Sequence, residues 1–115
     1  MRQLLRSFSA AIKGIRVGIT GQRNLKIQMG ISLLVIVLGI SVDLSAGDWG
    51  LVATAIGLVI TAELMNTAVE SLVDRVEPRQ NPIAGKVKDV VAGAVLIAAL
   101  TAVVIGVVVF YKYLP

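Results

Sequence analysis

Four polar side chains recur at helical spacing within an otherwise apolar stretch of the chain. They are Glu63, Asn66, Glu70 and Asp74, separated by three, four and four residues. Residues three and four apart lie on one face of a helix, so these side chains share an arc about 80° wide. Two carboxylates one or two turns apart can hold Mg²⁺ together with water and phosphate oxygens. A third carboxylate, surrounded by apolar neighbours, could serve as a general base.

A polar stripe at a helix end can also be the solvated continuation of a membrane span. That interpretation explains Asp74 and partly explains Glu70. It does not explain Glu63, because residues 60–65 around it are membrane-like in composition. Ionisable groups within a span are costly and usually functional. We therefore interpret the stripe as a functional site.

Further charged groups are expected at the same depth in the membrane. Lys86, Lys88 and Asp89 open the third apolar segment, and Arg23 and Asn24 open the first. Cations there would neutralise phosphate charge, and positioning with charge neutralisation supplies most of the catalysis in phosphoryl transfer. The pattern indicates transfer from a soluble nucleotide to a lipid hydroxyl. The chain contains no G-x-x-x-x-G-K-[ST] loop and no protein-kinase signature, so such a kinase would belong to neither architecture.

The composition places these residues in a membrane. Hydrophobic residues make up 57% of the 115 residues, more than a soluble domain of this size could bury. The chain has no Cys and no His, which excludes the usual zinc sites and leaves carboxylates and lysines for proton chemistry. The formal net charge is +4. Because the cations flank apolar spans, anionic lipid explains them better than nucleic acid does.

The elements that must position the stripe follow from the hydropathy pattern. Residues 1–20 predict an amphipathic helix that lies in the membrane interface. Residues 24–44, 49–76 and 86–112 predict transmembrane helices. We therefore expect an all-α integral membrane protein in which residues 1–115 form a single domain.

The cations set the expected orientation. Of the 11 cations, all except Lys112 lie before the first span or between the second and the third. The positive-inside rule places those segments in the cytoplasm. We expect the N-terminus inside and the C-terminus outside.

Two motifs resemble one known family. Residues 62–75, A-E-L-M-N-T-A-V-E-S-L-V-D-R, are similar to the signature E-x-x-N-[ST]-A-[IV]-E-x-x-x-D of the prokaryotic diacylglycerol kinase and undecaprenol kinase family. Residues 88–96, K-D-V-V-A-G-A-V-L, are similar to its second motif. The resemblance implies a multi-pass lipid kinase of the bacterial inner membrane. It also implies a homotrimer with active sites between subunits, a membrane lipid and ATP as substrates, and Mg²⁺ as metal. The position of the cations beside apolar spans argues against a nucleic-acid partner.

The resemblance also implies a role for each residue of the stripe. Glu63 would be the general base toward the lipid hydroxyl, Asn66 would position base and phosphate, and Glu70 would ligate the metal. Glu63 and Asn66 would thereby contact the lipid substrate. The residues implied to contact the nucleotide or its metal are Asp74, Lys88, Asp89 and Arg6.

One position departs from the family pattern. Family members usually carry a Glu metal ligand where this chain has Gln22. An amide oxygen can still ligate Mg²⁺ but brings no charge, so weaker metal binding is expected.

The lipid substrate is predicted from motif details. The versions N-T-A-V-E and A-G-A-V-L are closer to the undecaprenol kinase branch of the family. We therefore favour undecaprenol slightly over diacylglycerol, with undecaprenyl phosphate or phosphatidic acid as the product.

Two alternatives from other classes stay open. A small transporter could use Glu63 as a titrating site, although such proteins usually carry polar residues on several spans. A non-catalytic membrane scaffold could use the glycines as close-packing positions. These glycines are Gly30, Gly39, Gly57, Gly93 and Gly106.

Overall fold

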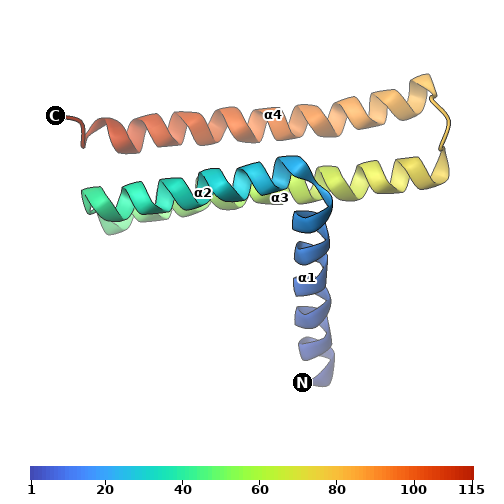
Figure 1. Ribbon diagram of the computed structural model, residues 1–115, viewed down its shortest axis with the longest axis horizontal. Coiled ribbons are helices and arrows are strands. Elements are labelled where there is room, and N and C mark those ends of the chain that lie inside the picture. Colours follow the sequence, from blue (N-terminus) through green and yellow to red (C-terminus); the bar gives the residue numbers. More distant parts are fainter.

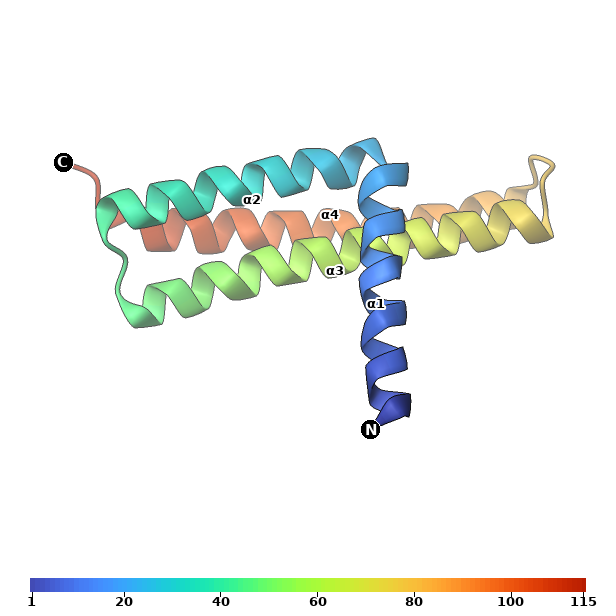
Figure 2. The same ribbon diagram turned by 60° about the horizontal axis from the view of Figure 1, so that its bottom comes forward.

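The computed structural model describes residues 1–115 as four helices without strands (Figure 1). The helices are α1 (Arg2–Gly21), α2 (Arg23–Val42), α3 (Ala46–Val76) and α4 (Pro82–Tyr111). α2, α3 and α4 run alongside one another, whereas α1 leaves the bundle crosswise (Figure 2). α2, α3 and α4 are each long and apolar enough to cross a membrane. The expected all-α fold, with one amphipathic helix and three candidate spans, is confirmed.

Local signals set where the helices begin and end. The side chain of Ser45 accepts a hydrogen bond from the backbone of Asp48 at 3.2 Å and so caps the start of α3. Asn81 caps α4 in the same way, and Pro82 occupies the first turn, where a missing N–H costs nothing. α3 and α4 therefore begin at Ala46 and Pro82 rather than at residues 49 and 86.

The two connections beside α2 have different backbone conformations. Asp43, with φ of 59°, ends α2 in the left-handed region, which short polar residues tolerate. Gln22 is extended (φ −126°, ψ 124°) and separates α1 from α2. This single extended residue turns the chain from the direction of α1 into the bundle.

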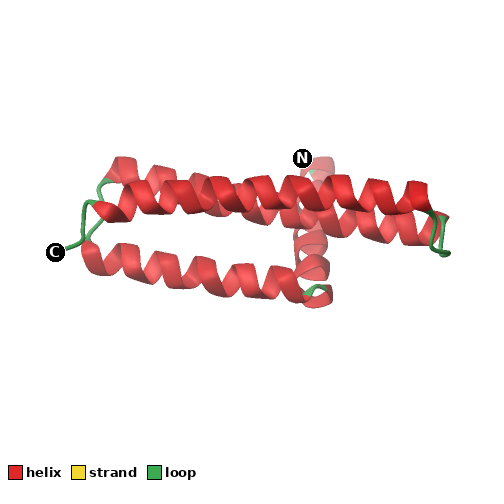
Figure 3. Cartoon of the chain, turned by 90° about the horizontal axis from the view of Figure 1, so that it is seen from above, coloured by secondary structure: helices red, strands yellow, loops and turns green.

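Packing is concentrated along α3, which contacts α4 most extensively and also contacts α2. Figure 3 shows α3 and α4 continuing together to their shared loop, beyond the point where α2 meets α1. Only 11 of 115 residues are buried, so most of the apolar surface faces outward. That distribution suits a chain whose solvent is lipid.

The end of the bundle that holds both the α2–α3 turn and the C-terminus has a small apolar core and a charged network. Leu44, Val52 and Val109 form the core. Beside it, Asp48 is 5% exposed and accepts hydrogen bonds from Lys112 Nζ and from the hydroxyl of Tyr113, each at 2.9 Å. These contacts fasten the C-terminal segment to the start of α3.

Candidate active site

The polar stripe lies on one face of α3 in the half nearer the α3–α4 loop. Glu63 is 5% exposed, and Asn66 and Glu70 are half-buried. The side-chain amide of Asn66 donates to Glu70 Oε1 at 3.4 Å. The hydroxyl of Thr67 donates to the backbone carbonyl of Glu63 at 3.0 Å and is thereby occupied. The spacing of three and four residues thus brings an amide and two carboxylates together.

The carboxylate of Glu63 is buried without a cationic partner. The two ion pairs of the chain are Lys88 with Asp74 and Lys112 with Asp48. A buried carboxylate that lacks a counter-ion is costly, so packing alone does not account for Glu63. The burial of this unpaired carboxylate therefore calls for a functional explanation.

Asn66 and Glu70 offer the oxygen ligands that a hard cation prefers. The amide nitrogen of Asn66 is used by Glu70, while its oxygen Oδ1 is buried without any hydrogen-bond partner. Carboxylate and amide oxygens suit Mg²⁺. No three acidic groups of the chain come together in a geometry that could hold a metal ion. The pair therefore fits a metal whose remaining ligands come from phosphate, water or another subunit.

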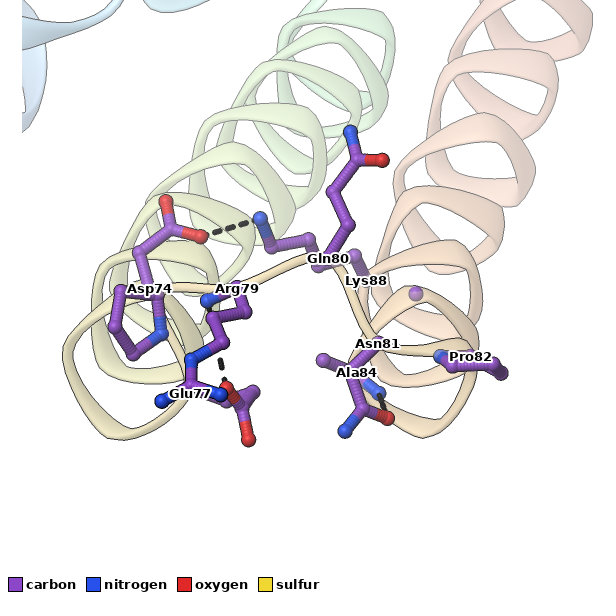
Figure 4. A pocket seen from close by; sticks show the side chains of 10 residues that line it. Asp74, Glu77, Arg79, Gln80, Asn81, Pro82, Ala84 and Lys88 are labelled. Carbon is purple, nitrogen blue, oxygen red and sulfur yellow. Dashed lines mark hydrogen bonds and ion pairs between the residues drawn. The ribbon is translucent and has the colours of Figure 1, made fainter.

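A polar pocket adjoins the stripe at the α3–α4 loop (Figure 4). Its volume is about 480 Å³, and residues 77–82, from the loop and the start of α4, line most of it. Lys88 of α4 pairs with the carboxylate of Asp74 of α3 at its edge. Figure 4 shows this pair and the hydrogen bond by which the backbone of Arg79 donates to Glu77 at 3.4 Å. Charged groups from two helices thus border one cavity.

The other predicted site residues are not joined to this arrangement by hydrogen bonds. Arg6 is exposed on α1, and Asp89 is exposed on α4 next to Lys88 in sequence. Gln22 is half-buried in the α1–α2 connection. None of the three forms a side-chain hydrogen bond with the stripe. Among the predicted site residues, the structure connects Asn66 with Glu70 by a hydrogen bond and Asp74 of α3 with Lys88 of α4 by an ion pair.

Two structural features beside the stripe are not predicted by the sequence patterns. The first is the set of loop residues around the pocket, for which proximity to Asp74 was the available signal. The second is Gly18, which lies against Leu64 of α3. No sequence pattern distinguishes this glycine from Gly14 or Gly21 on the same helix.

The fold and this site define a class: a small helical membrane protein with a carboxylate–amide stripe beside a polar pocket. The profile of the family described as prokaryotic diacylglycerol kinase matches residues 9–110. The chain belongs to this family, and the resemblance found in its motifs is confirmed. It is therefore a membrane lipid kinase, which sets aside the transporter and scaffold alternatives.

Curated relatives cover nearly the whole chain. The undecaprenol kinase of Bacillus subtilis (strain 168) is 32% identical over 110 residues, which are 96% of this chain and 89% of the relative. The diacylglycerol kinase of Synechocystis sp. is 38% identical over 104 residues, 90% of this chain but 59% of that protein. The diacylglycerol kinase of Escherichia coli (strain K12) is 29% identical over 103 residues, 89% of this chain and 84% of the relative.

Proposed function

We propose that this protein transfers the γ-phosphoryl group of ATP to the hydroxyl of a membrane lipid, with Mg²⁺ as the metal. The observation that carries the proposal is the buried carboxylate of Glu63 one turn from the hydrogen-bonded pair of Asn66 and Glu70. A base, an orienting amide and a metal-binding carboxylate on one helical face are the parts that phosphoryl transfer needs.

Glu63 accepts the proton of the lipid hydroxyl as its oxygen attacks the γ-phosphorus. The new O–P bond forms while the bond from the γ-phosphorus to the bridging oxygen breaks, and ADP leaves. Asn66 orients the reacting groups through its side-chain amide. Bound Mg²⁺, held by Glu70 with amide oxygen from Gln22, would screen the phosphate charge.

The nucleotide is proposed to lie at the loop end of α3 and α4. Asp74, Lys88 and Asp89 would contact it or its metal, with Arg6 near its access route. The polar pocket of about 480 Å³ bordered by the Asp74–Lys88 pair supports this placement. A lysine supplies a point charge suited to a phosphate group.

The lipid tail is proposed to occupy the groove between α2, α3 and α4. This groove has a volume of about 360 Å³ and a mainly apolar lining that includes Val59, one turn before Glu63. It extends along the helices toward Phe110. With its hydroxyl at Glu63, a lipid could extend its long apolar chain along this groove toward Phe110. From the motif details, we favour undecaprenol slightly over diacylglycerol as this lipid.

We further propose that residues 1–115 act as one domain in a homotrimer in the bacterial inner membrane, with the N-terminus in the cytoplasm. The cation distribution supports this orientation. The wide apolar exposure and the incomplete metal ligand set of one chain support assembly.

The test is phosphate transfer from labelled ATP in mixed micelles, with undecaprenol and diacylglycerol offered separately. Glu63→Gln keeps the shape of the side chain but removes the base, so kcat should fall by about 10²- to 10⁴-fold. The control is Asp43→Asn in the α2–α3 turn, which removes one negative charge, as Glu63→Gln does, but at an exposed position. This variant should keep wild-type activity. Near-normal turnover by Glu63→Gln would refute the assigned base.

A further inference from the structure

Three helices meet at a close contact beside the stripe, which we call the Gly18 junction. It consists of Gly18 of α1, Leu25 of α2 and Leu64 of α3. Gly18 is buried and Leu25 is 0% exposed. A Cβ atom on Gly18 would lie 2.5 Å from Cδ2 of Leu64 and 3.3 Å from Cδ2 of Leu25. Glycine allows this approach because it has no side chain.

The junction is the place where α1 is seated on the bundle. Gly18 is the one buried residue of α1, and the helix extends away from the bundle toward the N-terminus (Figure 2). Cβ atoms added at Gly14 or Gly21 would meet nothing within 4 Å. The close approach is therefore specific to one position of the helix.

The junction adjoins two proposed site residues. Leu64 follows Glu63 directly in α3, so the position of its side chain is tied to that of the Glu63 backbone. Gln22 lies in the connection between Gly18 and Leu25. A shift of α1 at Gly18 therefore acts on both the stripe and the α1–α2 connection.

We propose that Gly18 is a positioning residue for phosphoryl transfer. Its contact with Leu64 seats the amphipathic helix α1 against α3 and holds the Glu63 segment in place. This inference rests on the proposed function, in which Glu63 takes the hydroxyl proton. Gly18 itself touches no reacting group and acts through Leu64.

Graded substitutions separate this role from a general effect on folding. With Gly18→Ala the terminal methyl of Leu64 can rotate aside, whereas Gly18→Val requires α1 to move away. Replacement of a helical glycine by alanine favours the helix itself. A positioning role therefore predicts lower turnover without lower thermal stability in Gly18→Ala.

The experiment measures kcat and KM for lipid and ATP with the full chain in mixed micelles, together with helicity and thermal unfolding by circular dichroism. Gly18→Val should lower kcat by about ten- to a hundredfold, because misplacement by about 1 Å can cost that much. Gly18→Ala should lower it less, and the KM for ATP should stay constant. Gly14→Ala and Gly14→Val are matched controls that should keep wild-type kcat.

Removal of the opposing side chain provides a rescue. Because Leu64→Ala makes room for a Cβ atom, Gly18→Ala in the Leu64→Ala background should cost no further turnover. Unchanged kcat in both Gly18 variants would overturn the inference, and so would an equal loss in the Gly14 controls. If Gly18→Val does not fold, the inference is tested with Gly18→Ala alone. It then requires that Gly18→Ala lower kcat in the wild-type background but not in the Leu64→Ala background.

The failure of this inference can be distinguished from that of the proposed function. Normal activity in both Gly18→Val and Glu63→Gln would refute the assignment of Glu63 as the base and, with it, the positioning role of Gly18. A normal Gly18→Val beside an inactive Glu63→Gln would leave the base in place and overturn only the inference about the junction.

Discussion

The ion pair of Asp74 with Lys88 allows a role in structure to be separated from a role in nucleotide binding. It joins α3 to α4 beside the loop pocket. The perturbation is Asp74→Asn, which keeps the size of the side chain and removes its charge. Lys88→Gln and the double variant complete a double-mutant cycle.

The geometry sets the size of the structural effect. The side chains of Asp74 and Lys88 are 62% and 38% exposed, so water and salt screen the pair strongly. Exposed ion pairs contribute about 0.2 to 1 kcal/mol. With this exposure we expect about 0.5 kcal/mol or less in the free energy of unfolding. A lost contact with ATP or its metal would instead cost about tenfold in KM, which corresponds to about 1.4 kcal/mol.

The assay combines initial rates over a range of ATP concentrations with thermal unfolding in the same micelles. We expect Asp74→Asn to raise the KM for ATP about tenfold while the unfolding transition hardly moves. Asp43→Asn controls for loss of an exposed acid elsewhere. The assignment of Asp74 to nucleotide binding is wrong if stability falls and KM does not. It is also wrong if the KM effect disappears in the Lys88→Gln background, because Asp74 would then act only by holding Lys88.

Three further predictions address the far end of the bundle, helix packing and the metal. The hydrogen bond to Asp48 raises the pKa of Lys112, so its stabilising effect is complete below the ordinary lysine pKa of about 10.4 and is lost as pH rises through the higher folded-state pKa. Asp48 is ionised at neutral pH, because hydrogen bonds from Lys112 and Tyr113 stabilise its carboxylate. The difference in unfolding midpoint between wild type and Lys112→Met should therefore be constant from neutral pH up to the ordinary lysine pKa and shrink as pH rises further; a difference that grows there would contradict the assignment. Gly39→Ala places a Cβ atom 2.7 Å from an aromatic ring and should destabilise the fold by about 1 to 3 kcal/mol, whereas Gly30→Ala, with open space around it, should not. Gln22→Glu should lower the Mg²⁺ concentration needed for half-maximal rate, and an unchanged or higher requirement would remove Gln22 from the metal ligands.

Much of the architecture could be predicted from the sequence because lipid imposes simple constraints. Long apolar segments must be helical, since a spanning backbone has to satisfy its own hydrogen bonds. The contact of Asn66 with Glu70 follows from their spacing of four residues. Hydropathy alone predicts that α4 begins at residue 86, whereas Asn81 and Pro82 provide an N-cap and a first-turn proline that start the helix earlier.

The remaining contacts depend on tertiary geometry that local patterns do not encode. Asp48 meets Lys112 across 64 positions of sequence, and no local pattern links the two residues. The contact of Gly18 with Leu64 depends on the direction in which α1 leaves the bundle. The extended backbone of Gln22 sets that direction, and no periodicity predicts it.

The two ends of the bundle differ in how tightly they are packed and in the polar groups that they carry. At the end near the C-terminus, the apolar core and the bonded carboxylate of Asp48 hold three helices together. At the other end, only α3 and α4 continue to the loop, and the groups there are polar and partly exposed. Binding regions are often drawn from the less tightly packed parts of a fold. One chain supplies the proposed base, an amide and the proposed metal-binding carboxylate on a single helical face, but no three acidic groups that could enclose a metal. The proposed assembly would therefore have a chemical role, because a neighbouring subunit would supply ligands beyond those that phosphate and water provide.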